Sequence, residues 1–154
     1  MVYQNMLIAV DGSNEAEGAF QRALKIAKSE NVKLYIAHVV DTKNLMTVQQ
    51  YAPYGDFVEE ARKYGENLLN EYAEKAKMQE FENVETVLQS GSPKRELSRN
   101  IPEKYSIDLI VCGATGLNAV ERFVMGSVAE QIVRNAPCDV LVVRDEKAKR
   151  EENE

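Results

Sequence analysis

Short segments rich in apolar residues alternate with longer amphipathic segments along the 154-residue chain. Apolar runs of four to eight residues, bounded by turn formers, are typical of strands buried on both faces of a sheet. Five strands are expected, at Met6–Val10, Lys33–Val40, Val84–Leu88, Leu109–Cys112 and Val140–Val143. Because helical segments separate them, the pattern predicts an α/β fold in which right-handed crossovers build one parallel sheet with helices on both faces.

Helical periodicity marks the segments between these strands. After a turn at residues 11–14, with Ser13 or Asn14 as the expected helix cap, one apolar face comprises Ala16, Ala19, Phe20, Ala23, Leu24 and Ala27. A long helix is expected from about residue 56 to 78, with an apolar face made of Phe57, Ala61, Tyr64, Leu68 and Tyr72. Shorter helices are expected after Ser92-Pro93, with Leu97 and Ile101 facing inward, and over about residues 127–135.

The composition describes one domain with an acidic surface. Apolar residues make up 44% of the chain, charged residues 29%, and the formal net charge is −6. A domain over residues 1–145 is expected, followed by a charged, disordered tail over residues 146–154. An acidic chain lacks the basic surface that nucleic acids and anionic membranes require, so neither is an expected partner.

The cysteines and the first residues indicate a cytoplasmic protein. Cys112 and Cys138 form no CxxC pair, and two thiols without a disulfide framework are typical of reduced, intracellular proteins. The apolar run Met6–Val10 is too short for the core of a signal peptide. No stretch approaches the roughly 20 apolar residues that a membrane-spanning helix needs.

A glycine-rich segment after the fourth expected strand is the strongest candidate for a ligand site. Its spacing is Gly113-x2-Gly116-x9-Gly126-Ser127. Glycine permits positive φ and close approach of a ligand, and successive backbone N–H groups together with a helix N-terminus favour a phosphate. The Ser127 hydroxyl can donate to a phosphate oxygen or lie beside a metal such as Mg²⁺. The spacing matches neither a Walker-type loop nor a GxGxxG fingerprint. The alternative interpretation is that these glycines only form turns between a strand and a helix.

This spacing resembles the ATP-binding motif of the universal stress protein family, in its nucleotide-binding branch. The strand ending in Asp11-Gly12-Ser13 and the segments at residues 37–41, 91–93 and 137–143 are similar to that family as well, so that the resemblance covers about residues 5–144. It implies a fold like the adenine nucleotide alpha hydrolases, with an open five-stranded parallel sheet of order 3-2-1-4-5. The nucleotide would lie where the order reverses, between strands 1 and 4.

The resemblance also implies which residues would hold the phosphates of ATP. Gly113, Gly116, Gly126 and Ser127 match the phosphate-binding positions, and Val128 would add its backbone N–H group beside Ser127.

Four further positions match the part of the family site that holds the nucleoside. Asp11 would contact the ribose, Val10 would lie under the nucleoside, the backbone of Val39 would recognise adenine, and Cys112 would lie near the base or ribose. Asp11 could instead cap the first helix, and the two roles are compatible.

Other residues near the expected site have a structural and a functional interpretation. His38, the single histidine, is interpreted as a satisfied core or strand-end residue rather than a catalyst. Cys112 is interpreted as a packing thiol because no basic neighbour in sequence activates it. Arg122 could reach a phosphate or lie in solvent. Tyr51 and Tyr54 could form a lid or simply cover apolar surface.

The sequence shows no arrangement typical of catalysis: no Ser/His/Asp set, no paired carboxylates at a motif spacing and no Cys/His metal cluster. The leading hypothesis is an ATP-binding regulatory protein of stress adaptation, with slow hydrolysis, self-phosphorylation or no turnover. An adenylating or nucleotidyl-transfer enzyme and a nucleotide-independent interaction module are the alternatives.

A homodimer is the expected assembly. In the order 3-2-1-4-5, the apolar strand Val140–Val143 lies at an edge of the sheet, and uncovered apolar edge strands are pairing sites. The same strand of a second chain can pair with it antiparallel across a two-fold axis. The family resemblance implies the same interface.

Overall fold

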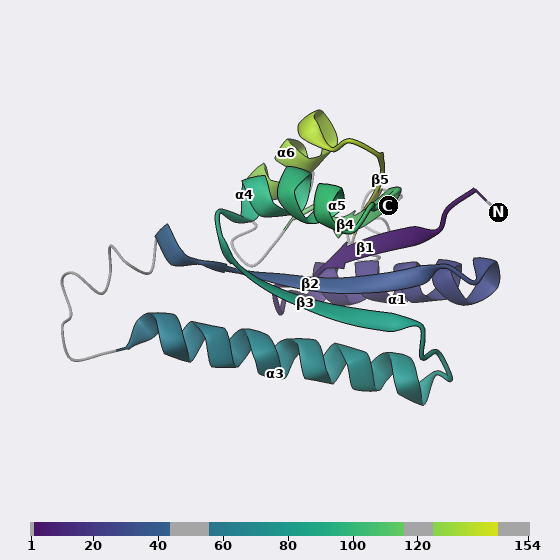
Figure 1. Ribbon diagram of the computed structural model, residues 1–154, viewed down its shortest axis with the longest axis horizontal. Helices are drawn as coiled ribbons and strands as arrows, with labels where there is room; N and C mark the ends of the chain where they lie inside the picture. Colours follow the sequence, from purple (N-terminus) through teal and green to yellow (C-terminus); the bar gives the residue numbers. More distant parts are fainter. Residues whose placement is uncertain (1, 44–55, 116–124, 145–154) are drawn as a thin grey trace, which may run out of the picture.

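The computed structural model describes residues 2–43, 56–115 and 125–144 (Figure 1). The described strands are β1 (Asn5–Ala9), β2 (Lys33–Asp41), β3 (Val84–Gly91), β4 (Leu109–Gly113) and β5 (Asp139–Val143). All neighbouring strands pair in parallel, in the order β3-β2-β1-β4-β5. The predicted five-stranded parallel sheet and its order are therefore confirmed.

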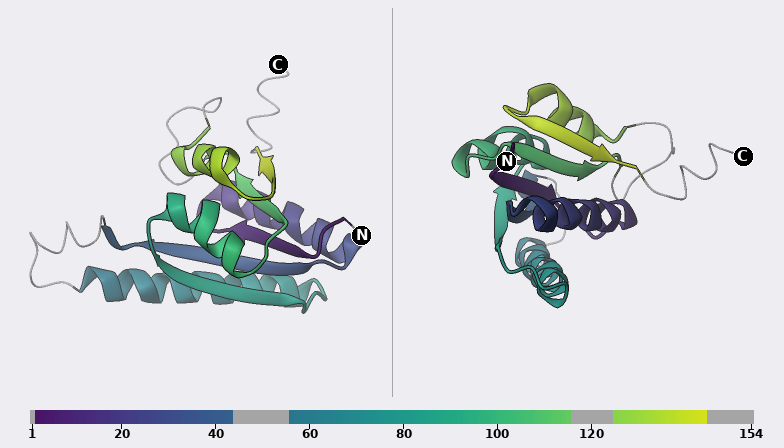
Figure 2. Two further views of the ribbon diagram at one scale, coloured as in Figure 1. Left: turned by 45° about the horizontal axis from the view of Figure 1, so that its top comes forward. Right: turned by 90° about the vertical axis from the view of Figure 1, so that its right-hand side faces the viewer.

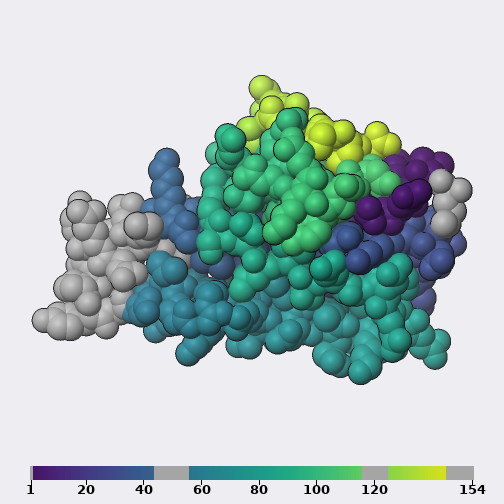
Figure 3. Space-filling view, in the orientation of Figure 1, coloured from purple at the N-terminus to yellow at the C-terminus, as the bar shows by residue number. Residues whose placement is uncertain are grey.

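Helices cover both faces of this sheet (Figure 2). They are α1 (Asn14–Glu30), α3 (Phe57–Met78), α4 (Pro93–Arg95), the π-helical turn η1 (Glu96–Asn100), α5 (Ile101–Lys104) and α6 (Ser127–Asn135). Helices α1 and α3 pack on one face of the sheet, and α4, η1, α5 and α6 form the layer on the opposite face. In the space-filling view, α3 lies along the bottom of the molecule and α6 at its top (Figure 3). None of the described helices is long and apolar enough to cross a bilayer.

The alternation of side chains along each strand divides the core into two halves. On β1, Met6 and Ile8 point toward α1 and α3, whereas Leu7 points toward the η1–α6 layer. All three side chains are fully buried. A strand buried on both faces needs apolar residues at every position, which is why β1 lacks the polar alternation of a surface strand.

Helix α1 begins where the sequence predicts, and Ser13 is its cap. The Ser13 side-chain oxygen accepts a hydrogen bond from Ala16 N at 3.1 Å, which satisfies one of the unpaired amides of the first turn. The predicted apolar face of α1 is buried in full. The helix ends at Asn31, which takes a left-handed conformation with φ 54°.

The predicted inner face of α3 is wrong at Tyr64, whose exposed fraction is 51%. The buried residues of this helix are Gly65, Leu68, Leu69, Tyr72 and Ala76. Gly65 has no side chain, so the helix approaches β2 and β3 closely at this point, and the inward face centres on Gly65 rather than on its neighbour Tyr64.

Strand β3 is three residues longer than predicted because its backbone continues to pair after its apolar residues end. Gln89, Ser90 and Gly91 pair with Val39, Val40 and Asp41 of β2. A strand at the edge of a sheet can present polar side chains to water while its backbone stays in the ladder. The periodicity of apolar residues therefore ends before the strand does.

Candidate functional site

The carboxyl ends of β1 and β4 lie side by side at the point where the strand order reverses. Met6 to Ile8 of β1 pair with Leu109 to Val111 of β4, so the chain leaves both strands at the same edge of the sheet. Ligands of open parallel sheets bind beyond this edge. The structure thus brings together the turn at Asp11 and the start of the glycine segment at Gly113, as predicted.

Asp11 shapes the turn between β1 and α1. Its Oδ1 accepts a hydrogen bond from Ser13 N at 2.9 Å, and the side chain is partly buried. Of the two roles considered for Asp11, the helix cap belongs to Ser13. Val10, directly before Asp11, is 3% exposed and donates its N–H group to the Ala37 carbonyl at 2.9 Å.

Tyr64 of α3 lies over this turn, a contact that sequence reasoning missed. Gly12 has φ +85°, and a Cβ atom on it would lie 2.3 Å from the Tyr64 hydroxyl oxygen. The residues around Gly12 in the sequence give no sign of its contact with Tyr64, because this contact depends on where α3 lies relative to the end of β2. Any side chain at position 12 would therefore meet both backbone strain and the tyrosine.

His38 holds the end of β1 in place. Its Nδ1 lies 2.8 Å from the Val10 carbonyl oxygen, and its ring meets the Tyr64 ring edge-on at a centroid distance of 6.1 Å. This partner confirms the interpretation of His38 as a satisfied strand-end residue. Val39, the next residue of β2, points to the other side and is buried in the core half that contains Cys112.

Cys112 is a packing thiol, as expected. Its side chain is 4% exposed, and burial raises the pKa of the thiol to about 11. A thiol with a raised pKa is a poor nucleophile at neutral pH. The pKa of Cys138 is also raised to about 11, first by burial and then by the nearby carboxylates of Asp108 and Asp139.

Gly113, the last residue of β4, is required by its neighbour on α1. A Cβ atom there would lie 3.1 Å from Glu15 Cβ and 3.2 Å from the Glu15 carbonyl carbon, closer than side chains normally pack. The absence of a side chain lets the first turn of α1 rest directly on the end of β4. Gly113 thus brings Glu15 next to the glycine segment.

Backbone and carboxylate contacts fix the described start of that segment. Ala114 N donates to the Val143 carbonyl at 3.0 Å, and the Ala114 carbonyl accepts from Gly126 N at 2.7 Å. Thr115 N donates to Glu15 Oε2 at 2.6 Å. Glu15 was not among the sequence candidates; its place in the first turn of the helix after β1 was the available signal, because that helix packs beside β4.

The last part of the predicted motif opens α6. Ser127 is the first residue of this helix, and Gly126 is its N-cap without a side-chain hydrogen bond. Gly126 has φ −64° and ψ 156°, so it does not use the positive φ that glycine permits: this extended conformation is open to any residue. The N–H groups of Ser127 and Val128 belong to the first turn, where amides have no partner within the helix.

Several sequence candidates lie outside the described residues. They are Gly116, Arg122, Tyr51 and Tyr54, together with the expected tail over residues 146–154. Within the described ranges, no group of three or more His, Cys, Asp or Glu side chains could hold a metal ion.

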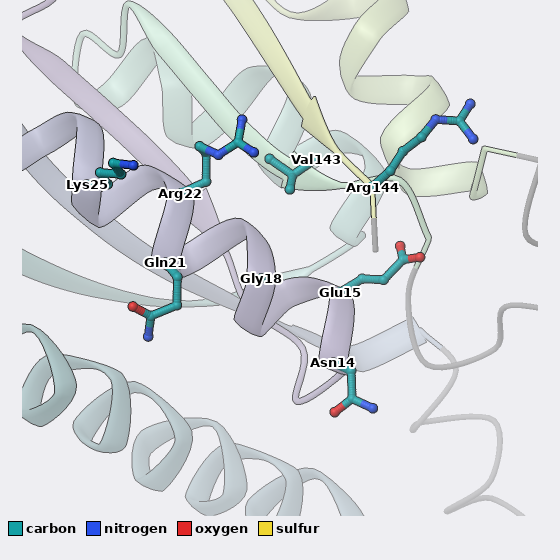
Figure 4. Close-up of a pocket in the computed structure, with 8 residues that line it drawn as sticks. All are labelled: Asn14, Glu15, Gly18, Gln21, Arg22, Lys25, Val143 and Arg144. Carbon is teal, nitrogen blue, oxygen red and sulfur yellow. The ribbon is translucent and has the colours of Figure 1, made fainter. Parts of the chain in front are cut away.

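A groove of about 330 Å³ runs beside this region, between α1 and the end of β5 (Figure 4). Its lining residues are Asn14, Glu15, Gly18, Gln21, Arg22, Lys25, Val143 and Arg144. Glu15 and Arg144 lie at one end of the groove and Lys25 at the other. The carboxylate that accepts from Thr115 N thus shares this groove with three cationic side chains.

Comparisons with known proteins agree with this architecture. A relative from Staphylococcus haemolyticus (strain JCSC1435), named as a universal stress protein, is 48% identical over 146 residues, which cover 95% of this chain and 87% of the relative. The solved structure of universal stress protein UspA from Lactobacillus plantarum has a TM-score of 0.79 at 30% identity, covering 94% of this chain and 99% of the other.

A second solved structure, of a universal stress protein in complex with cAMP, has a TM-score of 0.67 at 28% identity. It covers 94% of this chain and 98% of its own. The model of the universal stress protein family matches residues 2–144. With its sheet order, the turn at Asp11 and the loop start at Gly113 in place, the chain belongs to the universal stress protein family.

Proposed function

We propose that this chain is a regulatory protein of stress response that binds an adenine nucleotide, with ATP as its ligand, at the edge formed by β1, β4 and α6. The observation that carries the proposal is the hydrogen bond of 2.7 Å between Gly126 N and the Ala114 carbonyl. It joins the end of β4 to the N-terminus of α6, so that the two described ends of the glycine segment lie next to each other.

The phosphates would lie against the two described ends of the segment. Gly113, Gly126 and Ser127, with Gly116 between them, would line this subsite. The N–H groups of Ser127 and Val128 and the positive end of α6 attract an anion. The Ser127 side chain is exposed, so its hydroxyl is accessible to a phosphate or an accompanying Mg²⁺.

The nucleoside would lie over the ends of β1 and β2. Asp11, with a carboxylate that accepts only one described hydrogen bond, would take a ribose hydroxyl. Val10 and Cys112 would form the apolar floor, and the backbone of Val39 would recognise adenine. The solved relative in complex with cAMP supports a site for adenine nucleotides on this fold.

Slow or absent hydrolysis is part of the proposal. Fast phosphoryl transfer to water needs a group that orients or activates the water. The imidazole of His38, the single histidine, is bonded to the Val10 carbonyl and packed against α3. Steady-state phosphate release with Mg²⁺ is expected to be far below the roughly 10 s⁻¹ of a typical enzyme.

Gly126→Val tests the site. Because Gly126 has φ −64°, valine fits the backbone, while its branched side chain fills the space in front of the first amides of α6. Calorimetric titration should show at least a tenfold loss of ATP affinity with an unchanged circular dichroism spectrum. Gly18→Val is the matched control, since a Cβ at Gly18 meets no atom within 4 Å. Equal affinities of Gly126→Val and wild type would refute the assignment.

The proposal includes a cytoplasmic location and a homodimer that pairs through β5. This strand has one neighbour, β4, in the described sheet, and Val140, Leu141 and Val142 are each partly exposed. A second copy would extend the sheet and cover these side chains.

A further inference from the structure

The exposed face of helix α1 is basic, although the chain as a whole is acidic with a formal net charge of −6. Arg22, Lys25 and Lys28 follow one another at intervals of three residues, and all three are exposed. In a helix this interval places side chains on one face, about 4.5 Å apart along the axis. Positive charge therefore gathers on the side of α1 that lies opposite its buried apolar face.

These three side chains have no anionic partner among the residues that the structure describes. Glu15, which lines the groove together with Arg22 and Lys25, bonds to Thr115 N instead. Other cations of the described chain do have a glutamate within 3.1 Å, namely Lys33, Arg62, Lys75, Arg99 and Arg134. The charges on α1 are thus available to a partner that carries carboxylates.

Gly18 leaves a gap in the same face. It is exposed and lies one turn before Arg22, and a Cβ atom on it would meet no described atom within 4 Å. A glycine in a helix interior costs about 0.5–1 kcal/mol relative to alanine. Packing within the described domain gives no reason for this cost, whereas the close approach of a second backbone requires a glycine.

Two depressions border this face and meet at Gln21 and Lys25. The groove of about 330 Å³ between α1 and the end of β5 includes Gly18 in its lining (Figure 4). Toward the end of the helix follows a hollow of about 560 Å³, lined by Gln21, Lys25, Lys28, Ser29 and Gln79. Together they extend along nearly the whole of α1, over about 22 Å, which is the length of a helix of about four turns.

We propose that the outer face of α1 is a docking surface for an acidic α-helix of another protein. The partner helix lies along the two depressions with a small residue against Gly18, where the missing side chain lets the two backbones approach closely. Its carboxylates, three or four residues apart, meet Arg22, Lys25 and Lys28, which have the same spacing. Electrostatic complementarity then fixes the register of the two helices. This surface acts without a nucleotide, so the inference goes beyond the proposed function.

The probe is a synthetic, alanine-based helix of about 16 residues with glutamates three or four residues apart along one face. A matched peptide has glutamine in place of each glutamate. Titration at low salt into ¹⁵N-labelled protein should shift the amide resonances of Gly18, Arg22 and Lys25 with the glutamate peptide and leave them in place with the glutamine peptide. Added salt should weaken the binding, because the charges involved are exposed.

A pair of double variants tests the charges. Arg22→Glu with Lys25→Glu should weaken binding of the glutamate peptide at least tenfold. Lys63→Glu with Lys77→Glu, at two exposed positions of α3, changes the net charge of the protein equally and should alter the affinity less than threefold. The comparison separates a local surface from the general effect of net charge.

The gap at Gly18 has its own variant. Gly18→Leu keeps every charge but fills the gap, so it should weaken binding at least fivefold. Asn67→Leu, on the exposed side of α3, is the control and should leave the affinity unchanged. Leucine favours the helix at both positions, and circular dichroism checks that the fold is kept.

Three results would overturn the inference. Binding that depends on Arg22 and Lys25 but not on Gly18 identifies a general surface for anions and excludes the docked helix. Inorganic polyphosphate that binds more tightly than the glutamate peptide, with the same dependence on both cations, assigns the surface to phosphate chains. Resonances of α1 that do not move with the glutamate peptide refute the docking surface altogether. Each of these results leaves the proposed nucleotide site standing.

Discussion

Two helical glycines of this chain should respond oppositely to alanine. In a helix interior, Gly to Ala stabilises by about 0.5–1 kcal/mol through the unfolded chain and the helix propensity. Gly18 of α1 has open space around it, so Gly18→Ala should show this gain in full. Gly65 of α3 has no open space around it, because a Cβ there would lie 2.6 Å from His38 Cδ2 and 2.8 Å from Leu88 Cδ1.

The two contacts at Gly65 differ in how easily they yield. Leu88 Cδ1 is the end of a flexible side chain and can turn away. The His38 ring is fixed by its bond of 2.8 Å to the Val10 carbonyl, so either this bond breaks or α3 moves outward. Overpacking of this kind costs about 1–3 kcal/mol, which exceeds the propensity gain. Gly65→Ala should therefore be less stable than Gly18→Ala by about 1–3 kcal/mol.

Urea denaturation followed by circular dichroism measures this difference from the transition midpoints at a common slope. Because His38 positions the end of β1, Gly65→Ala should also weaken nucleotide binding, whereas Gly18→Ala should not. Equal stabilisation of both variants would show that α3 does not approach β2 as closely as described, and would remove the reason given for the exposed position of Tyr64.

Three further predictions concern the helix cap, the buried thiol and the edge strand. Ser13→Ala should lower the free energy of unfolding by about 1 kcal/mol in urea denaturation, because Ala16 N loses its acceptor. Since burial raises the pKa of Cys112 to about 11, the contribution of this thiol to stability should be constant below pH 9 and be lost as the pH rises toward 11; a Cys112→Ala variant should therefore show a smaller fall in stability between pH 9 and 11 in the same denaturation series. Light scattering should give twice the chain mass of 17.4 kDa, and Val142→Lys should shift it toward the monomer with its circular dichroism spectrum kept; a wild-type monomer at tens of micromolar would refute pairing through β5.

The fold was predictable because its strongest signals are local. A strand buried on both faces must be apolar throughout, so β1, β2 and β4 were found within one or two residues at each end. The edge strand β5 was found as closely because it is apolar at four of its five positions, although most of its side chains are only partly buried. The cap at Ser13 and the buried face of α1 follow equally from neighbouring residues. The end of β3 was missed because an edge strand keeps its backbone pairing after its apolar side chains have ended.

The site was predictable only in part because its details depend on distances between elements. Helical periodicity placed Tyr64 on the inner face, but the close approach at Gly65 decides which side chains face the sheet. The contact of Glu15 with Thr115 depends on how closely α1 rests on Gly113. The glycine spacing indicated a ligand site, but it could not tell that Gly126 takes an ordinary extended conformation.

The peptide group between Ala114 and Thr115 has a consequence for the rigidity of the chain after β4. Both of its polar ends are bonded, the oxygen to Gly126 N and the N–H group to Glu15. Because a peptide group is planar, these two bonds fix its orientation and, with it, the direction in which the chain leaves the strand. A rotamer change of Glu15, a motion of picoseconds to nanoseconds, releases one end only, and the bond to Gly126 N keeps the other end in place.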